Sequence, residues 1–335
     1  MAIFESRLKS DHSPGAFKEL FVRHENNPVL SAKDWPYPVN TVFNPAATSF
    51  EGKTLLLARV EDRRGFSHLT KAISANGIDN WQIDPQPTFY QSLSSQSEQW
   101  GVEDPRITYL DELNKYAVVY TGFSSVGPVV NMALTDDFVN FERMGTMMPP
   151  DDKDAALFPR KFGDKWLMIH RPVQQGAHIW LSSSENLHNW GDHRILINSR
   201  GGCWWDGPKV GLNTPPLETP EGWLILYHGV RLHAGGAIYR LGLAMLDLDD
   251  PMKVIHRGDE WIFNPSTSYE HFGDVHDVVY PCGWVWDKDT NKLRMYYGAA
   301  DTCIGLATAN MSDIISYITS CPPSYSTNNE RRNRA

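Results

Sequence analysis

Cysteine is scarce in this chain of 335 residues, and long apolar runs are absent. The four cysteines (Cys203, Cys282, Cys303 and Cys321) form no close pair and no metal-ligand spacing, so we expect reduced thiols and no metal site. The N-terminus lacks the apolar core of a signal peptide, and no stretch is long enough to span a membrane. Together these absences predict a cytoplasmic protein.

Positive charge is also in short supply. The 31 lysines and arginines face 40 aspartates and glutamates, which gives a net charge of −9 at pH 7. Neither a nucleic acid nor a membrane surface is therefore an expected partner, and any anion must bind at a local basic cluster. The chain also lacks a glycine-rich phosphate loop and a Gly-x-Ser-x-Gly motif, which argues against the common nucleotide-binding loops and the α/β-hydrolase nucleophile.

What the sequence does contain is a strand–turn–strand unit that recurs five times. Each copy has a short run, a charged or glycine-containing turn, and a second run rich in aromatic and aliphatic residues; the copies begin at Phe43, Val102, Leu157, Gly207 and Tyr280. Their polar or proline-containing corners fall at Asn44, Asp104, Pro159, Pro208 and Pro281. A spacing of about 50 to 75 residues is typical of propeller blades. We therefore predict an all-β fold, with one five-bladed β-propeller domain over residues 1–335.

Five further segments have the pattern of outer hairpin turns of the blades, at 73–81, 133–141, 181–190, 243–251 and 306–314. Amphipathic helix patterns are confined to the first twenty residues and to 312–318, so the propeller should carry only short terminal helical segments. The polar residues 322–335 are predicted to be disordered. In such a propeller the inner strand of every blade lines one central channel, and distant corners meet there in a small-molecule site.

The sharpest motif is Val-Glu-Asp-Pro-Arg at 102–106. A proline restricts the backbone of the residue before it, so Asp104 at a strand start is held in few orientations and is suited to act as an acid aimed into the channel. Alternatively, Asp104 caps a turn and pairs with Arg106. The motif alone leaves both interpretations open.

A basic set follows in the third and fourth copies, formed by Arg160, Arg171, Lys209 and His228. Such groups converging without matching acids would be costly unless an anion filled the gap. Phosphate fits, because guanidinium groups bind its oxygens in bidentate fashion. Alternatively, each group pairs with a nearby carboxylate such as Asp154, Asp164 or Asp206, and composition does not separate the two.

A third set suits a carbohydrate. Carboxylates, an amide, an arginine and a tyrosine lie in or beside the corners: Asn44, Arg59, Glu61, Glu103, Asp274, Asp301 and Tyr280. Such groups fork hydrogen bonds to vicinal hydroxyls beside flat apolar rings. Most aromatic residues, among them Trp205, Tyr227 and Tyr297, are nevertheless expected in the blade cores. His276 and Asp277 either contact an acceptor sugar at the same mouth or only cap their loop.

Taken in order, several motifs of the chain resemble those of glycoside hydrolase family 130, and the resemblance covers about residues 27–318. The motifs are VEDPRI, ALFPRK, MIHRP, PKVG, ETPEGWLILYHGV, LAMLDLDDP and YYGAADT. That family comprises β-mannoside phosphorylases and a smaller set of β-mannosidases, and the resemblance implies a five-bladed propeller. It implies that Asp104 is the catalytic acid, which relays its proton through a hydroxyl of the mannosyl unit being cleaved. By the same resemblance, phosphate-binding positions fall on Arg160, Arg171, Lys209 and His228, and positions that hold the cleaved mannose on Asn44, Arg59 and Asp301.

The implied reaction is inverting phosphorolysis of a β-linked mannoside, with inorganic phosphate as co-substrate, no other cofactor, and α-mannose 1-phosphate as product. A phosphorylase needs only the acid, whereas an inverting hydrolase also needs a base; the family's hydrolases lose the basic set. The acid motif reads Val-Glu-Asp here, where the family's β-1,4-mannosyl-glucose and mannooligosaccharide enzymes tend to carry tyrosine before the aspartate. This difference brings the chain nearer to members that act on β-1,2-linked mannosides.

Two alternatives stay open at this stage: an inverting β-mannosidase in which Glu103 serves as the base, and a non-catalytic glycan-binding propeller. The acceptor sugar is not fixed, because it depends on variable loops, here around Arg63, Ser124, Gln174 and 233–236. A homo-oligomer paired through a terminal helix is one arrangement open to such a propeller.

Overall fold

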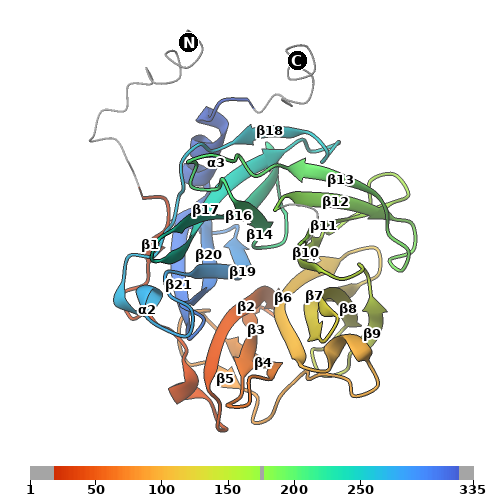
Figure 1. Ribbon diagram of the computed structural model, residues 1–335, viewed down its shortest axis with the longest axis vertical. Coiled ribbons are helices and arrows are strands. Elements are labelled where there is room, and N and C mark those ends of the chain that lie inside the picture. Colours follow the sequence, from red (N-terminus) through yellow and green to blue (C-terminus); the bar gives the residue numbers. More distant parts are fainter. Residues whose placement is uncertain (1–18, 174–176, 324–335) are drawn as a thin grey trace.

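Five blades of antiparallel strands, which belong to four sheets, stand around one axis, and the innermost strand of each blade faces the middle of the ring (Figure 1). The computed structural model describes residues 19–173 and 177–323. The predicted five-bladed β-propeller is confirmed. The inner strands are β2 (Thr41–Phe50), β6 (Gly101–Leu110), β10 (Asp152–Leu157), β14 (Lys209–Leu212) and β19 (Val279–Asp287). Each of the five repeats seen in the sequence lies in one blade, but the third was predicted to begin at Leu157, which is the last residue of its inner strand.

Blades one and two are joined into one continuous sheet by a single parallel pairing of Ser67 with Gly101. Their strands are β2 (Thr41–Phe50), β3 (Lys53–Glu61), β4 (Ser67–Ser74) and β5 (Gln82–Ile83), then β6 (Gly101–Leu110), β7 (Lys115–Ser124), β8 (Gly127–Thr135) and β9 (Glu142–Thr146).

The remaining blades are separate sheets. Blade three contains β10 (Asp152–Leu157), β11 (Trp166–Pro172), β12 (Ile179–Ser184) and β13 (Gly191–Ile197). Blade four contains β14 (Lys209–Leu212), β15 (Leu217–Thr219), β16 (Gly222–His233), β17 (Gly236–Leu246) and β18 (Val254–Arg257). Blade five contains β19 (Val279–Asp287), β20 (Lys292–Ala299), β21 (Cys303–Asn310) and, at its outer edge, β1 (Val22–Arg23).

The predicted outer turns connect the third and fourth strands of blades one to four, as expected. In blade five the corresponding segment leads into helix α3 (Met311–Ser320), which confirms the helix predicted at 312–318. The other helical segments are α2 (Ser268–His271) and short 3-10 turns at Ala32–Asp34 and Gln96–Glu98. The helix predicted in the first twenty residues falls almost wholly outside the described residues, as does the tail from residue 324.

Helix α3 buries its apolar face on its own chain. Met311, Ile314 and Ile318 pack into the cluster between blades four and five. No helix among residues 19–173 and 177–323 is long and apolar enough to cross a membrane. All four cysteines are free thiols, and Cys282 and Cys303 are buried in strands as predicted.

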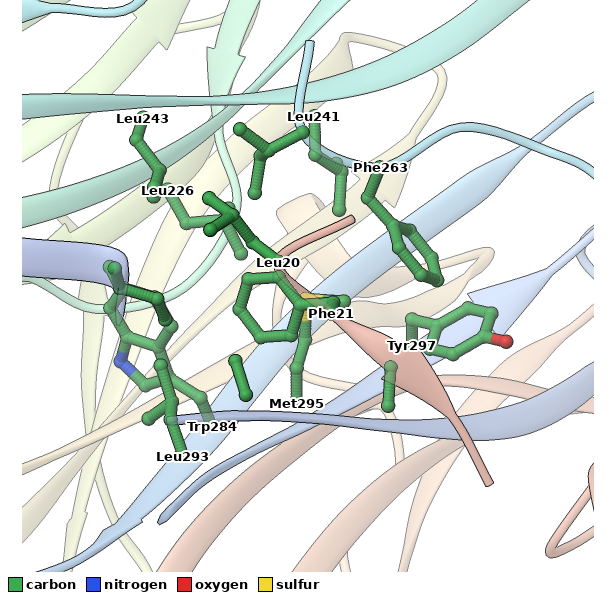
Figure 2. Close-up of a cluster of buried hydrophobic side chains, with 14 of the residues drawn as sticks. Leu20, Phe21, Leu226, Leu241, Leu243, Phe263, Trp284, Leu293, Met295 and Tyr297 are labelled. Carbon is green, nitrogen blue, oxygen red and sulfur yellow. The ribbon is translucent and has the colours of Figure 1, made fainter. Parts of the chain in front are cut away.

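The ring is closed by the first described residues of the chain. Leu20 and Phe21 insert among side chains of β16, β17, β19 and β20, where Phe21 packs edge-on against Phe263 (Figure 2). Next to them, Arg23 makes a bidentate pair with the buried carboxylate of Glu270, at 2.8 and 2.9 Å. Strand β1 then pairs with β21 as the outer strand of blade five. Apolar burial and a buried ion pair therefore fasten residues 20–23 to blades four and five.

Phe21→Ala should lower the free energy of unfolding by about 3–5 kcal/mol, because it empties a fully buried ring site in this closure. Val22→Ala is the matched control: Val22 is the next residue and is 63% exposed, so its effect should stay within about 0.5 kcal/mol. Urea denaturation followed by tryptophan fluorescence gives both values. Equal effects of the two substitutions would show that Phe21 does not fasten the ring.

Candidate active site

Three of the five inner strands turn in the same way at the site. Asn44, Asp104 and Asp154 have left-handed backbones, with φ of 43°, 49° and 56°, and each lies at a bulge in its strand. After glycine, asparagine and aspartate are the residues that adopt this left-handed conformation most readily. A bulge re-aims the side chain that it carries. The three bulges occupy equivalent places in blades one, two and three, so they gather an amide and two carboxylates at the ring's centre.

The first half of the site surrounds Asp104, whose side chain is buried. Its Oδ1 accepts hydrogen bonds from Asn44 Nδ2 at 2.9 Å and from Arg59 Nη1 at 3.1 Å. Arg59 Nη2 also donates to Glu103 Oε1 at 3.0 Å. Burial by itself would raise the pKa of Asp104, but the charges of Arg59 and Lys153 and the hydrogen bond from Asn44 outweigh it and hold that pKa below its usual range. Asp104 is therefore ionised in the free protein.

Of the other three carboxylates predicted for the sugar site, Asp301 and Glu61 lie near Arg59, and Asp274 does not. Burial raises the pKa of Asp301 to about 6, with the charge of Arg59 opposing the rise. Glu61 Oε2 lies 3.4 Å from Arg59 Nη2. Asp274 is exposed at the rim, where it accepts a hydrogen bond from Asn40 Nδ2 at 3.1 Å. The structure thus groups Asp301 and Glu61 with the acid and leaves Asp274 outside the buried site.

The second half of the site is built around Asp154, which is buried. Its Oδ2 accepts from Arg171 Nε at 2.6 Å, and its Oδ1 accepts from the Tyr280 hydroxyl at 2.5 Å. His228 Nε2 lies 3.8 Å from the same Oδ2. Burial opposes ionisation of Asp154, but the charges of Arg171 and the other basic groups around it keep its pKa well below the usual range. One carboxylate therefore binds side chains of blades three and five and lies close to His228 of blade four.

Positive charge still exceeds negative charge in this half. Lys209 Nζ donates to the Tyr239 hydroxyl at 2.7 Å, and burial, reinforced by the charges of Arg171 and Lys153, lowers the pKa of Lys209 to about 8. Burial also lowers the pKa of His228 well below its usual value, so its ring is neutral. Both ring nitrogens of His228 lack a hydrogen-bond partner among residues 19–173 and 177–323. A buried ring without partners beside several cations is suited to an anionic ligand with hydrogen-bonding oxygens.

Arg106 joins the two halves and is itself almost completely buried. Its Nη1 donates to the backbone oxygen of Asp104 at 3.1 Å, and its Nη2 donates to the backbone oxygen of Leu212 at 2.9 Å. Nη2 also lies 3.3 Å from the Tyr280 hydroxyl. Arg106 thus holds the backbone of the acid motif, while the partner of the Asp104 carboxylate is Arg59. The alternative in which Asp104 only caps a turn and pairs with Arg106 is not what the structure shows.

Arg160 does not join the basic cluster, contrary to the sequence prediction. It lies in the β10–β11 hairpin, at the opposite end of these strands from Arg171, and its Nε donates to Glu218 Oε1 at 3.1 Å. Its guanidinium also stacks 5.2 Å from the ring of Trp223. The error comes from aligning the blades on their prolines. Blade three has its left-handed corner five residues before Pro159, at Asp154, where alanine follows instead of proline.

Lys153 and Tyr239 belong to the site but were missed in the sequence. The charge of Lys153 lowers the pKa of Asp104 and of Asp154, so Lys153 acts electrostatically on both halves of the site. Asp154 was considered only as a partner that neutralises a cation, and it does pair with Arg171. A signal was available: Asp154 begins the run Asp-Ala-Ala, which parallels Asn-Pro-Ala at Asn44.

The loops predicted to surround the opening of the channel differ in where the structure places them. His276 Nδ1 contacts the backbone oxygen of His271 at 2.9 Å, and Asp277 Oδ1 contacts His271 Nδ1 at 2.6 Å, so both residues cap their own loop. Arg63, Ser124 and 233–236 lie at turns between the second and third strands of their blades, and Gln174 falls outside the described residues. As expected, Trp205, Tyr227 and Tyr297 are buried in blade cores. No group of His, Cys, Asp and Glu suited to a metal ion occurs in the described part of the chain.

Comparison with known proteins identifies the family of this chain. The family model described as beta-1,4-mannooligosaccharide phosphorylase matches residues 19–320. The chain belongs to glycoside hydrolase family 130. It is 35% identical to the 1,2-beta-oligomannan phosphorylase of Thermoanaerobacter sp., over 87% of this chain and 98% of that one. It is 32% identical to the beta-1,4-mannooligosaccharide phosphorylase of Ruminococcus albus, over 92% and 93% of the two chains.

A solved structure of the family gives the same ring. The beta-1,2-mannobiose phosphorylase from Listeria innocua, in complex with beta-1,2-mannobiose, superimposes with a TM-score of 0.81 at 28% identity. The superposition covers 89% of this chain and 99% of that one. The family 130 fold therefore extends over nearly all of the described residues.

Arg171→Ala should weaken the binding of inorganic phosphate about 10- to 100-fold, because it removes a charged donor from the buried cluster. Arg160→Ala should leave that binding unchanged, since Arg160 pairs with Glu218 outside the cluster. Isothermal titration calorimetry on the folded variants measures both affinities. An equal loss of phosphate affinity in the two variants would place Arg160 back in the anion site.

Proposed function

We propose that this protein is an inverting β-mannoside phosphorylase, which cleaves a β-linked mannoside with inorganic phosphate and releases α-mannose 1-phosphate reversibly. The observation that carries the proposal is the basic cluster of Lys153, Arg171 and Lys209, in which Arg171 is buried and the two lysines are half-buried, close to the buried carboxylate of Asp104. Phosphorolysis requires a proton donor next to a binding site for phosphate, and Asp104 and the basic cluster can supply these two parts. The family's phosphorylase relatives support the same assignment.

In this mechanism phosphate is the nucleophile and needs positioning rather than deprotonation. The guanidinium of Arg171 and the ammonium groups of Lys153 and Lys209 hold its oxygens, and the unpartnered ring of His228 offers a further hydrogen bond. Fixed in the cluster, phosphate attacks the anomeric carbon on the face opposite the leaving sugar. The C–O bond to phosphate forms as the glycosidic bond breaks, so a β-linkage gives an α-phosphate.

Asp104 supplies the proton that leaves with the glycosidic oxygen. Its lowered pKa in the free protein means that it must take up a proton when the substrates bind. A phosphate dianion beside it favours this step, because the new negative charge opposes the effect of Lys153 and Arg59 on Asp104. Binding of phosphate thereby promotes the protonation of Asp104, so phosphate binding prepares the acid for cleavage of the mannoside.

The sugar half supports a mannosyl unit as the group transferred. Asn44, Arg59 and the carboxylates of Glu103 and Asp301 present donors and acceptors that fork to vicinal hydroxyls. We favour a β-1,2 linkage, on the Val-Glu-Asp form of the acid motif and on the Thermoanaerobacter and Listeria relatives. A charged sugar phosphate does not cross membranes, which supports action in the cytoplasm.

A hydrolase would use Glu103 as a base that activates water, well separated from the acid. Glu103 instead shares the guanidinium of Arg59 with Asp104, so it lies on the same side as the acid and its charge is compensated. A hydrolase would also leave the basic cluster without a role. These contacts favour phosphorolysis over hydrolysis.

Incubation with β-1,2-mannobiose, with and without phosphate, tests the function. We expect α-mannose 1-phosphate to form only when phosphate is present. Asp104→Asn should reduce turnover by about 10²- to 10⁴-fold in the same assay, as expected for loss of a general acid. Free mannose released at the same rate without phosphate would identify a hydrolase, and full activity of Asp104→Asn would remove Asp104 from the mechanism. Parallel reactions with β-1,4-mannosyl-glucose determine the linkage.

The catalytic efficiency should follow a bell-shaped pH profile. The carboxyl group of Asp301, with a pKa of about 6, accepts sugar hydrogen bonds fully only above that pH, so activity should fall as the pH drops through about 6. Lys209, with a pKa of about 8, loses its charge above that pH, so phosphate affinity should fall as the pH rises. Lys209→Arg should move the upper limb to higher pH, because arginine stays protonated. An upper limb that stays in place in this variant would exclude Lys209 as its cause.

A further inference from the structure

A line of hydrogen-bonded polar side chains crosses blade three from its inner to its outer strand. Asp152, His170, Ser182 and His193 come one each from β10, β11, β12 and β13. Asp152 pairs with Pro172 and so lies diagonally across from His170, and His170 lies diagonally across from Ser182. Diagonal neighbours in adjacent strands share one face of the sheet. The first three side chains are buried, and His193 is exposed.

Every contact in this line is short. Asp152 Oδ2 lies 2.6 Å from His170 Nδ1, His170 Nε2 lies 2.7 Å from Ser182 Oγ, and Ser182 Oγ lies 2.6 Å from His193 Nδ1. When His170 is neutral, its Nδ1–H donates to the carboxylate, so Nε2 must accept the Ser182 hydroxyl hydrogen. Ser182 Oγ then accepts Nδ1–H of His193. All three hydrogen bonds donate toward Asp152.

The inner end of the line fixes the backbone of Arg171. Asp152 Oδ1 accepts the backbone N–H of Arg171 at 3.1 Å. The side chain of the same arginine extends to Asp154, where Nε donates at 2.6 Å. Asp152 and Asp154 thus hold Arg171 at two points, one on its peptide and one on its guanidinium. With both ends held, a long side chain loses the freedom to leave the anion cluster.

We propose that Asp152, His170 and Ser182 are positioning residues for phosphate, which act by holding Arg171, and that His193 fixes the direction of the Ser182 hydroxyl. The proposal rests on the proposed function in one respect, that phosphate is the anion of the cluster. The line contributes no group to the reaction itself. Its role follows the general rule that a binding group is only as well placed as the residues that support it.

Ser182→Ala should weaken phosphate binding about tenfold, because it removes the buried hydrogen bond that orients His170. Ser183→Ala is the matched control: it lies on the same strand, donates to Asp192 at 2.7 Å outside the line, and should bind phosphate like the unchanged protein. Ser182→Thr keeps a hydroxyl and should restore affinity. In the phosphorolysis assay, the KM for phosphate should rise in Ser182→Ala while the KM for the mannoside stays constant.

The exposed end of the line provides a second test that does not disturb the core. His193→Phe should weaken phosphate binding in the same direction as Ser182→Ala, whereas His193→Asn keeps a donor near the position of Nδ1 and should bind normally. Calorimetry with inorganic phosphate alone measures these affinities even if no mannoside is cleaved. The proposed function fails by a different result, which is that the unchanged protein shows no phosphate-dependent cleavage of the mannoside. Equal phosphate affinity in Ser182→Ala, His193→Phe and Ser183→Ala would overturn the positioning role.

Discussion

The centre of this propeller depends on one buried carboxylate. Asp154 receives Arg171 from its own blade and Tyr280 from blade five, and it lies within 4 Å of Arg106 from blade two and His228 from blade four. Removing the partner of a buried charge is far more costly than the pair is stabilising. Asp154 therefore makes it possible to bury the two arginines, Arg106 and Arg171, close together. Because a single carboxylate cannot neutralise them completely, the surplus of positive charge is available to a ligand.

The site separates into two electrostatic regions that meet at Lys153. On one side Arg59 shares its charge among Asp104, Glu103 and Asp301, and negative groups predominate. On the other side positive groups predominate around Asp154. A neutral sugar and an anion have different requirements, and each region meets one of them. Because the charge of Lys153 acts on both Asp104 and Asp154, an anion bound beside Lys153 changes the electrostatic potential at the acid.

The blades and much of the acidic region could be predicted from the sequence, because Asn44 and Asp104 each precede a proline at a strand start. Blade three has the same left-handed corner at Asp154, but alanine replaces the proline there, so in the sequence only the short run Asp-Ala-Ala marks the equivalence that the backbone shows. That is why Arg160 was placed in the cluster in error. The line from Asp152 to His193 could not be predicted either, since diagonal neighbours depend on strand register, which composition and motifs leave undetermined.

The pairing of β1 with β21 joins Val22 to Thr308 and so spans most of the sequence. During synthesis β1 leaves the ribosome first, and its partner strand is made only after four blades are complete. Until then the fifth blade lacks its outer strand, and the apolar side chains of Leu20 and Phe21 have no pocket to fill. Closing so long a loop is slow, because the entropy of bringing its ends together must be overcome before the contacts form. An interrupted translation product can thus stack blades but cannot complete the circle, and it would expose apolar surface that chaperones and proteases recognise.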